Sequence, residues 1–434
     1  MTKEKSNKMK RQLFSIALIF LFAGAGIMAQ EKEPDFGIQI SGFVKNDFFW
    51  DSRQTVAARE GHFLLWPSPE LMSTDNLDIN AQAGFNFLAI QSRLKATVTG
   101  PDAFGAKTSA VIEGDFFAQS DANINLLRLR HAMIKLNWQH TEILTGQYWN
   151  PLFVTSCFPG TVSFNTGTPL QSFARNPQVR LTQTIGSIKI VAAALAQRDF
   201  SSRGPDPADP SKTMVSSTFL RNSRIPDLHL QAHYHSGNAE SGKTLDMGVG
   251  IAWKTITPRL SSATGYRVKE SVSGITALAF SKLTLTPITI KLQGRYGENI
   301  ADVLSISGFA VKAIEDPVTG QQSYTPLQNI TVWGEIHTNG KKVQAGLMGG
   351  ILRNLGTKET MSDPGNPVYG LGTNIAFLYR VSPRVVFISN KTKLALEVEY
   401  TTAGYGTGHD LDYLPQSIQP VTNLRGLMSA IYAF

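Results

Sequence analysis

Apolar and polar residues alternate with a period of two over long stretches of this chain, and this pattern constrains its fold more than any other feature. In the segment 244–254, "TLDMGVGIAWK", every second residue is apolar: Leu245, Met247, Val249, Ile251 and Trp253. The segments 287–297 and 393–400 repeat the pattern. Successive side chains of a β-strand point to opposite faces, so each segment predicts a strand with one apolar face and one polar or small face. About sixteen segments qualify as strands.

Two architectures fit such strands: a soluble sandwich, or a transmembrane barrel that turns its apolar face to lipid. The connections decide between them, because short and long ones alternate along the chain. The short ones are "PDAFG", "QH", "GS", "GNAESGK", "SKLT", "TNGK" and a segment around "SPRVV". The long ones lie near residues 51–75, 118–125, 151–176, 198–226, 255–265, 298–328, 353–367 and 403–420. Short turns at one rim and long loops at the other predict an all-β fold, an antiparallel transmembrane β-barrel of about 16 strands with both ends in the periplasm.

The first residues predict where the chain is sent. Four lysines and Arg11 precede the apolar stretch "LFSIALIFLFAGAGIMA", which ends at Ala29. This is the pattern of a signal peptide, so we expect residues 1–29 to be removed and residues 30–434 to form one barrel domain. The alternative is an uncleaved membrane anchor. Beyond this segment the longest apolar run, "IVAAALA", is far shorter than the ~20 residues that a membrane helix needs.

Charge and cysteine content exclude other classes. The five bases and one acid of the leader account for +4 of the formal net charge of +8, which leaves +4 on the mature chain. No basic run or stripe accompanies this small excess, so we expect no nucleic-acid partner. Cys157 is the only cysteine and cannot form an internal disulfide.

The chain ends on "LMSAIYAF", an alternating segment with no polar tail. Met428, Ala430, Tyr432 and Phe434 would form the lipid-facing side of the last strand. Its expected partner is the first strand, around Ile38, Ile40 and Val44, because a barrel must close to leave no free edge in the membrane. The terminal aromatic residues would lie at the membrane interface, where aromatic belts form. A last strand that ends in Phe also resembles the signal that the barrel assembly machinery reads.

The inward faces of the strands predict the lining of a pore. Basic side chains across a narrow pore stabilise a passing anion. The alternative is that the charged groups pair with one another and only hydrate the wall. The faces near Ile90 are ambiguous, because the alternation slips there as it would at a bulge. The basic candidates are Arg93, Lys95, Arg128, Arg130, Arg180, Lys291 and Arg295, and the acidic ones are Asp47, Glu113, Asp115, Glu397 and Glu399.

The connection 151–176 has too few polar residues for a solvated loop. We therefore expect it to fold into the lumen; the alternative is an outer lid or a subunit contact. His229, His233 and His235 alternate on one strand and are interpreted as lumen-lining residues, because no carboxylate or cysteine set with a metal-binding spacing lies nearby. No catalytic or nucleotide-binding motif occurs in a suitable context, so we expect no enzyme activity, no metal and no cofactor.

Several stretches together resemble the DcaP-type outer-membrane porins. They are "SGFVKNDFFWDSRQ", "QSRLKATVTG", "IEGDFF", "LRLRHAMIKL", "LTGQYWNPLF" and "ARNPQVRLTQ", in that order, with a thinner match through "LEVEYTTAGYG". The resemblance implies a sixteen-stranded homotrimeric porin in the cell outer membrane, in contact with lipid and lipopolysaccharide, that passes small and preferably anionic solutes. It also implies that Arg128, Arg130, Arg175 and Arg180 occupy the positions of the basic constriction.

One departure from the family concerns its N-terminus. The best-known members of the family carry a periplasmic coiled-coil segment before the barrel, whereas only "QEKEPDF" separates the expected cleavage site from the first strand here. This departure puts a coiled-coil contribution to trimer formation in doubt and leaves the barrel unaffected. Two other functions remain open at this point: a transporter for apolar compounds, which would need a plug and a greasy gate, and a barrel enzyme of the lipase type, which would need Ser and His facing lipid.

Overall fold

The computed structural model describes residues 36–238 and 242–434 of the chain. The leader expected at 1–29 lies outside the described residues, as does the middle of "GNAESGK". The strands that close into a barrel are β1 (Gly37–Asp51), β4 with β5 (Gly84–Leu88 and Arg93–Ala103), β6 (Ala106–Asp115), β7 (Arg128–Asn137), β8 (Thr141–Trp149), β9 (Arg175–Ile185), β10 (Ile188–Leu195), β13 (Asp227–Asn238), β14 (Lys243–Ile256), β15 (Val272–Thr284), β16 (Ile288–Glu298), β18 (Gln321–Thr338), β19 (Val343–Thr357), β21 (Ile375–Ser389), β22 (Thr392–Tyr405) and β25 (Gln419–Ala433).

The connections carry smaller elements. These are β2 (Thr55–Ala58), β3 (Phe63–Pro67), β11 (Arg203–Pro205), β12 (Thr213–Val215), β17 (Ser307–Asp316), β20 (Val368–Leu371), β23 (Gly408–His409), β24 (Pro415–Gln416), the helix α2 (Thr218–Ser223) and the 3-10 helices η1 (Ile79–Ala81), η2 (Asp121–Asn123) and η3 (Ala301–Val303). Among the described residues, no helix is long and apolar enough to cross a membrane.

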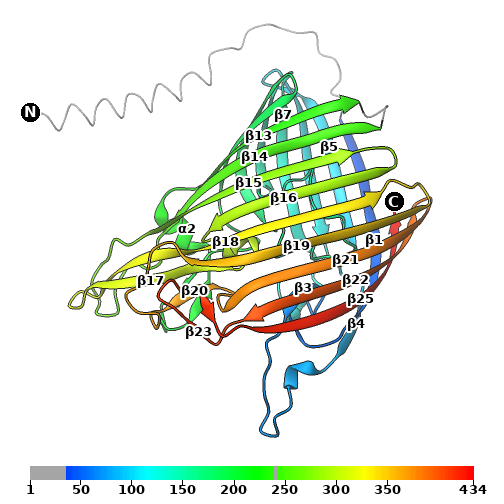
Figure 1. The fold of residues 1–434 in the computed structure, drawn as a ribbon. Helices are drawn as coiled ribbons and strands as arrows, with labels where there is room; N and C mark the ends of the chain where they lie inside the picture. The colour runs from blue at the N-terminus through cyan, green and yellow to red at the C-terminus, as the bar shows by residue number, and fades with distance from the viewer. Residues whose placement is uncertain (1–35, 239–241) are drawn as a thin grey trace, which may run out of the picture. The chain divides into compact units, whose positions relative to one another are not determined.

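Each barrel strand pairs antiparallel with the next along the chain, as the side-by-side ribbons from green β14 to red β25 show (Figure 1). The main sheet has 19 strands; β4 and β5 are halves of one barrel strand, and β17 and β20 extend the sheet beyond one rim. The described residues therefore form a closed barrel of sixteen strands, which confirms the predicted fold class. The break between β4 and β5 falls at residues 89–92, where the alternation slips in the sequence.

The last strand closes the barrel on the first. β25 pairs with β1 from Phe43 opposite Ala433 to Asp51 opposite Arg425, and Val44 lies opposite Tyr432 as expected. Ile38 and Ile40 pair with β5 instead, because β1 extends beyond the end of β25. The N–H of Phe434 donates to the carbonyl of Gly42 at 3.1 Å, and the N–H of Gly42 donates back at 3.2 Å. No strand edge is left open at this seam.

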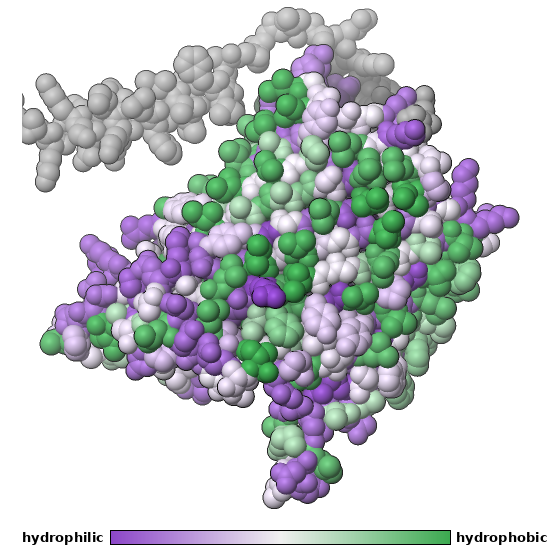
Figure 2. All heavy atoms as spheres, in the orientation of Figure 1, coloured by the Kyte–Doolittle hydropathy of each residue, from purple (hydrophilic) through white to green (hydrophobic). Residues whose placement is uncertain are grey.

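On the face that Figure 2 shows, many hydrophobic residues lie on the barrel wall, and hydrophilic residues gather on the protruding loops. Met428 and Tyr432 are 52% and 54% exposed, and the alternate residues Leu427 and Ser429 are buried. The same alternation holds along β14 and β22, whose outward residues include Val249, Ile251, Leu394 and Leu396. Such a wall suits a lipid environment.

Loop lengths differ between the two rims, as predicted. The rim with the short connections, of a few residues each, is called the turn rim, and the opposite rim is called the loop rim. The eight connections at the loop rim are called loops 1 to 8 and span residues 52–83, 116–127, 150–174, 196–226, 257–271, 299–320, 358–374 and 406–418. Two predicted turns were wrong. "SKLT" ends β15, and "SPRVV" lies inside β21, where Pro383 falls in a gap of the β21–β22 pairing. The true turns follow three to eight residues later, at 285–287 and 390–391.

Candidate functional site

Loop 3 folds into the barrel, as predicted, and is held there by side chains of the wall. Glu397 of β22 accepts hydrogen bonds from the N–H groups of Val162 (2.6 Å) and Ser163 (3.2 Å). Lys45 of β1 donates to the carbonyl of Val162 at 2.8 Å, and Lys291 of β16 donates to the carbonyl of Phe158 at 3.0 Å. A loop inside a protein must find partners for its backbone polar groups, and the inward charged residues of the wall supply them. Loop 3 therefore narrows the lumen at fixed points.

The interior around loop 3 is less polar than the sequence predicted. A buried apolar cluster joins side chains of loop 3 (Phe153, Phe164 and Phe173) to Phe63 and Trp66 of loop 1 and to inward side chains of the wall. The rings of Phe63 and Phe164 meet edge to face at 5.2 Å. Strand alternation assigns only the wall, whereas this cluster forms because loops from distant parts of the chain meet inside the barrel. The lumen is thus partly filled by a hydrophobic core.

Arginines and carboxylates of β5, β6 and β7 form a compact cluster on one side of the lumen. Arg130 donates from Nε to Glu113 Oε1 at 2.7 Å and from Nη1 to Asp115 Oδ2 at 2.8 Å. Arg128 donates from Nε to Asp115 Oδ1 at 2.8 Å. Arg93 lies 3.6 Å from Glu113 and 3.8 Å from Asp115. The strand register places these residues together, because Asp115 lies opposite Arg128 on one side and Arg93 on the other.

Arg175, at the start of β9, extends this arginine cluster. Its Nη2 lies 2.6 Å from Oδ2 of Asp199 in loop 4, and Arg128 lies 3.9 Å from the same carboxylate. Trp149 contacts both Arg130 and Arg175 through its ring, at 5.7 and 5.3 Å. Burial alone would raise the pKa of Asp199, but Arg175 and Arg128 lower it below its ordinary value. Four arginines thus face three carboxylates, which leaves one positive charge in excess.

Three of the predicted site residues lie outside the arginine cluster. Lys95 lies opposite Glu113 in the β5–β6 register, and no contact joins it to the arginines. Arg180 donates hydrogen bonds to Gln178 Oε1 at 3.0 Å and to the carbonyl of Trp149 at 2.7 Å, both within the wall. Arg295 stands on β16, across the ring of strands, where it donates to hydroxyl groups of loops 3 and 6. The inward face was assigned correctly for Arg295, but alternation does not show which side of the ring a strand occupies.

Sequence reasoning missed several basic residues that face the lumen, among them Lys45 and Arg384. Lys45 is buried and contacts loop 3, and Arg384 of β21 donates to Glu335 Oε1 at 2.9 Å. Arg384 was missed because "SPRVV" was interpreted as a turn. Lys45 alternates with Asp47 in "FVKNDFF", so the period of two could have identified it.

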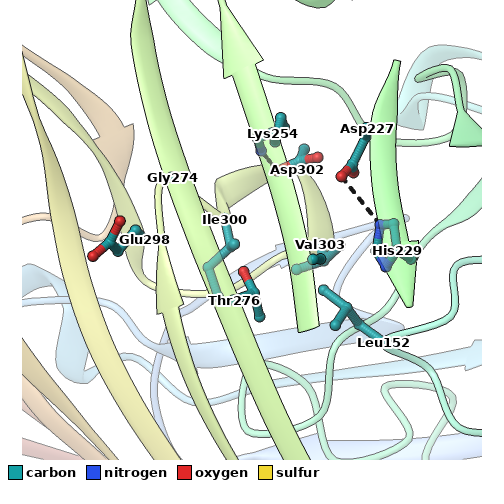
Figure 3. A pocket seen from close by; sticks show the side chains of 11 residues that line it. Leu152, Asp227, His229, Lys254, Gly274, Thr276, Glu298, Ile300, Asp302 and Val303 are labelled. Atoms are coloured by element: carbon teal, nitrogen blue, oxygen red, sulfur yellow. Dashed lines mark hydrogen bonds and ion pairs between the residues drawn. The ribbon is translucent and has the colours of Figure 1, made fainter. Parts of the chain in front are cut away.

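The histidines of β13 belong to separate surroundings. His229 Nε2 lies 3.1 Å from Asp227 Oδ1 at a small space beneath loop 6, where Lys254 also binds Asp302 (Figure 3). This space measures about 10 Å³, room for about one water molecule. His233 contacts Gln231, and His235 contacts Asp246 at 2.7 Å. Within the described residues, no three His, Cys, Asp or Glu side chains are placed to hold a metal ion.

Solved structures of outer-membrane channels share this fold. The outer membrane channel DcaP of Acinetobacter baumannii is 15% identical over 95% of this chain and 100% of its own, with a TM-score of 0.67. An anion-selective porin from Comamonas acidovorans is 8% identical over 92% of this chain and 100% of its own, with a TM-score of 0.53. OmpT, an outer membrane protein of Vibrio cholerae, is 9% identical over 94% and 100%, with a TM-score of 0.53. No protein-family model and no curated protein matches the chain.

At these identities the likeness concerns the fold. It confirms the expected resemblance to DcaP-type porins at that level, together with the architecture of an outer-membrane barrel.

Proposed function

We propose that this chain is an outer-membrane porin, a water-filled channel through which small hydrophilic solutes diffuse passively, with a preference for anions. The observation that supports it most is the fixed position of loop 3 beside the arginine cluster, whose four arginines exceed its carboxylates by one charge. Charge at a narrow section determines which ions pass, because low-dielectric walls concentrate the field there.

The preference for anions rests on the arginine cluster rather than on the net charge of the chain. Arg93, Arg128, Arg130 and Arg175 contribute to it, and Arg180 and Arg295 do so only at a distance from the cluster. The Comamonas acidovorans porin, which shares this fold, is described as anion-selective. The permeating solutes in this proposal are small anions.

In the membrane, the turn rim and both chain ends would lie in the periplasm, and the loop rim would meet lipopolysaccharide. The apolar outer wall would contact outer-membrane lipid, and the barrel assembly machinery would insert it with the help of the C-terminal strand. A homotrimer is the assembly that we propose; one OmpT structure is described as a trimer form. The mass of the detergent-extracted protein tests this assembly.

Single-channel recording in planar bilayers tests the channel. With a KCl gradient, we expect stepwise conductance and a reversal potential displaced toward the equilibrium potential of chloride. A reversal potential displaced toward the equilibrium potential of potassium would contradict the anion preference. A correctly folded protein that conducts no current would contradict the porin function.

The transporter for apolar compounds has one observation in its favour, the apolar cluster within the barrel. Its members Phe164, Phe173, Leu170 and Trp333 are at most 5% exposed and are packed against one another, so they form a core rather than a path. A lipase-type enzyme would need His beside Ser on the lipid face, and His229 and His233 face the lumen side of β13.

A further inference from the structure

A cavity of about 770 Å³ lies between loop 3 and the turn rim, and it is called the vestibule here. Its upper side is formed by loop 3, including Phe158 and Val162. Its lower end is bordered by residues at the turn rim, among them Lys391 and Ala433. It is far larger than the space beneath loop 6 and can admit a hydrated solute.

Seven lysines and arginines line the vestibule, and none of its described lining residues is Asp or Glu. The carboxylates that pair with these bases stand behind them. The side chains of Asp47, Asp115 and Glu335 are 1%, 0% and 0% exposed, and those of their partners Lys45, Arg130 and Arg384 are 4%, 2% and 7% exposed. The positive charge that a solute can reach most directly is therefore that of Arg93, Lys391 and Lys393, and no acid among the described residues lines the cavity beside them.

The bases stand on two sides of the vestibule. Lys45, Arg93 and Arg130 come from β1, β5 and β7. Lys291 and Arg384 come from β16 and β21, and β16 is nearly opposite β7 in the ring of strands. An anion with more than one negative charge interacts with both sides, whereas a chloride ion near one side is several ångströms from the other.

The guanidinium of Arg384 is closely packed against two glycines, and one of its N–H donors has no partner among the described residues. Its Nη1 is buried and has no hydrogen-bond partner. Gly346 leaves room for its guanidinium, because a Cβ there would come within 2.6 Å of Arg384 Cζ, and a Cβ at Gly160 would come within 2.8 Å of Nη2. Planar guanidinium groups bind oxyanions through paired N–H donors, so this free donor suits an oxygen ligand.

Lys391 and Lys393 form the entrance at the turn rim. Both are exposed, and neither takes part in an ion pair among the described residues. Their charges are therefore available to an entering anion, in contrast to those of Lys45 and Lys291, which bind Asp47 and Glu335.

We propose that the vestibule is a binding site for small polyvalent oxyanions of the phosphate type. Two members of the arginine cluster, Arg128 and Arg175, do not line it. Such an oxyanion is drawn in by Lys391 and Lys393 and held beneath loop 3 between Arg384 on one side and Arg93 on the other, where Arg384 Nη1 and Arg93 Nε have no hydrogen-bond partner among the described residues. The site rests on the proposed porin function and extends it. An anion bound there would slow the passage of monovalent ions through the channel.

The first test uses binding, which does not require conduction. The purified barrel in detergent is titrated with inorganic phosphate at pH 7.5 in low salt by calorimetry, with chloride as the comparison. We expect saturable binding of phosphate that weakens roughly threefold to tenfold when Lys391 and Lys393 are both replaced by Gln, the range for two exposed, screened charges. Arg384→Gln should weaken it independently.

The matched control is the pair Lys341→Gln and Lys342→Gln, on the neighbouring turn at 339–342 of the same rim, which is not part of the lining. It removes the same charge and should leave phosphate binding within twofold of the unchanged protein. An equal loss in the control would overturn the site, because rim charge in general would then suffice.

The second test is conduction. Phosphate added on the turn-rim side should reduce the chloride current, and the Lys391/Lys393 variant should need a higher phosphate concentration for half reduction. A channel that conducts chloride but neither binds nor responds to phosphate refutes the vestibule site and leaves the porin standing. A barrel that binds phosphate but never conducts refutes the porin and leaves the site standing.

Discussion

Arg130 shows how much one side chain contributes at the residue scale. Its guanidinium binds Glu113 and Asp115 together and also contacts the ring of Trp149. Without it Glu113 would keep Arg93 at 3.6 Å and Asp115 would keep Arg128 at 2.8 Å, so each buried carboxylate would lose one of its partners. Breaking a buried pair costs about 3–5 kcal/mol of stability when no partner remains, and the remaining arginines should make the loss here smaller. The arginines thus pair with carboxylates within the wall, as one of the two interpretations of the sequence expects; the other, that they stabilise a passing anion, stays a prediction.

Selectivity should follow the charge of the arginine cluster. Replacing Arg128 and Arg130 by Ser changes its excess from one positive to one negative charge and removes bulk from the lumen. We expect a higher conductance and a reversal potential shifted toward cations, measured in bilayers under a KCl gradient. Asp115→Asn is the opposite change and should shift the potential toward anions. The arginines would be purely structural if the double variant kept the original reversal potential.

A prediction for acid pH concerns Asp199. Its pKa is lowered in the folded protein, so its contribution to stability is present above the ordinary value of 3.8 and is lost as the pH falls through the folded value. The difference in thermal unfolding temperature between the unchanged protein and Asp199→Asn should therefore stay constant from pH 7 to about pH 4.5 and shrink below pH 3.8. A difference that already disappears at pH 5 would show that Arg175 does not hold this carboxylate ionised.

At the scale of elements, the strands and the entry of loop 3 into the lumen followed from the sequence, and the apolar cluster inside the lumen did not. Alternation in "KLALEVEY" specifies the faces of β22, because one face meets an apolar and the other a polar environment. The turn around "SPRVV" was wrong because Pro383 interrupts the pairing without ending the strand. The apolar cluster could not be derived, since Phe63 and Phe164 come from loops whose positions depend on the whole barrel.

Loop 3 should become mobile when its main acceptor is removed. Glu397→Ala deletes the hydrogen bonds to the N–H groups of Val162 and Ser163, each worth about 0.5–1.5 kcal/mol. We expect a noisier open channel with a larger mean conductance in single-channel records. Gln344→Ala, which also lines the vestibule but has no hydrogen bond to loop 3, is the matched control and should leave the noise unchanged. Equal noise in both variants would contradict the anchoring.

On the scale of the whole molecule, closure depends on the seam between β1 and β25. The seam joins residues nearly 400 positions apart, from Phe43 and Ala433 to Asp51 and Arg425. Such non-local pairing forms late in folding, because the chain between must first be arranged. The alternating end "LMSAIYAF" predicted this seam, and the position of Val44 opposite Tyr432 confirms it.

Phe434→Asp should impair assembly of the barrel in the outer membrane without affecting export across the inner membrane. The ring of Phe434 lies beside Gly42, and a charge there would be placed at the membrane interface. Heat-modifiable migration on a gel, with and without boiling, measures the folded fraction in outer-membrane preparations. Phe434→Trp keeps an aromatic ring and should assemble normally. Normal amounts of folded Phe434→Asp protein would show that the terminal ring is not needed.

The position of carboxylates behind the bases has a consequence for how this barrel can diverge. Asp115 and Glu335 already lie in the wall, so a descendant that prefers cations need not acquire a single new acid. Losing both Arg128 and Arg130 would leave the carboxylates of the arginine cluster in excess by one charge. The proposed anion preference of such a barrel could therefore reverse through loss of arginines alone, without the gain of any acid.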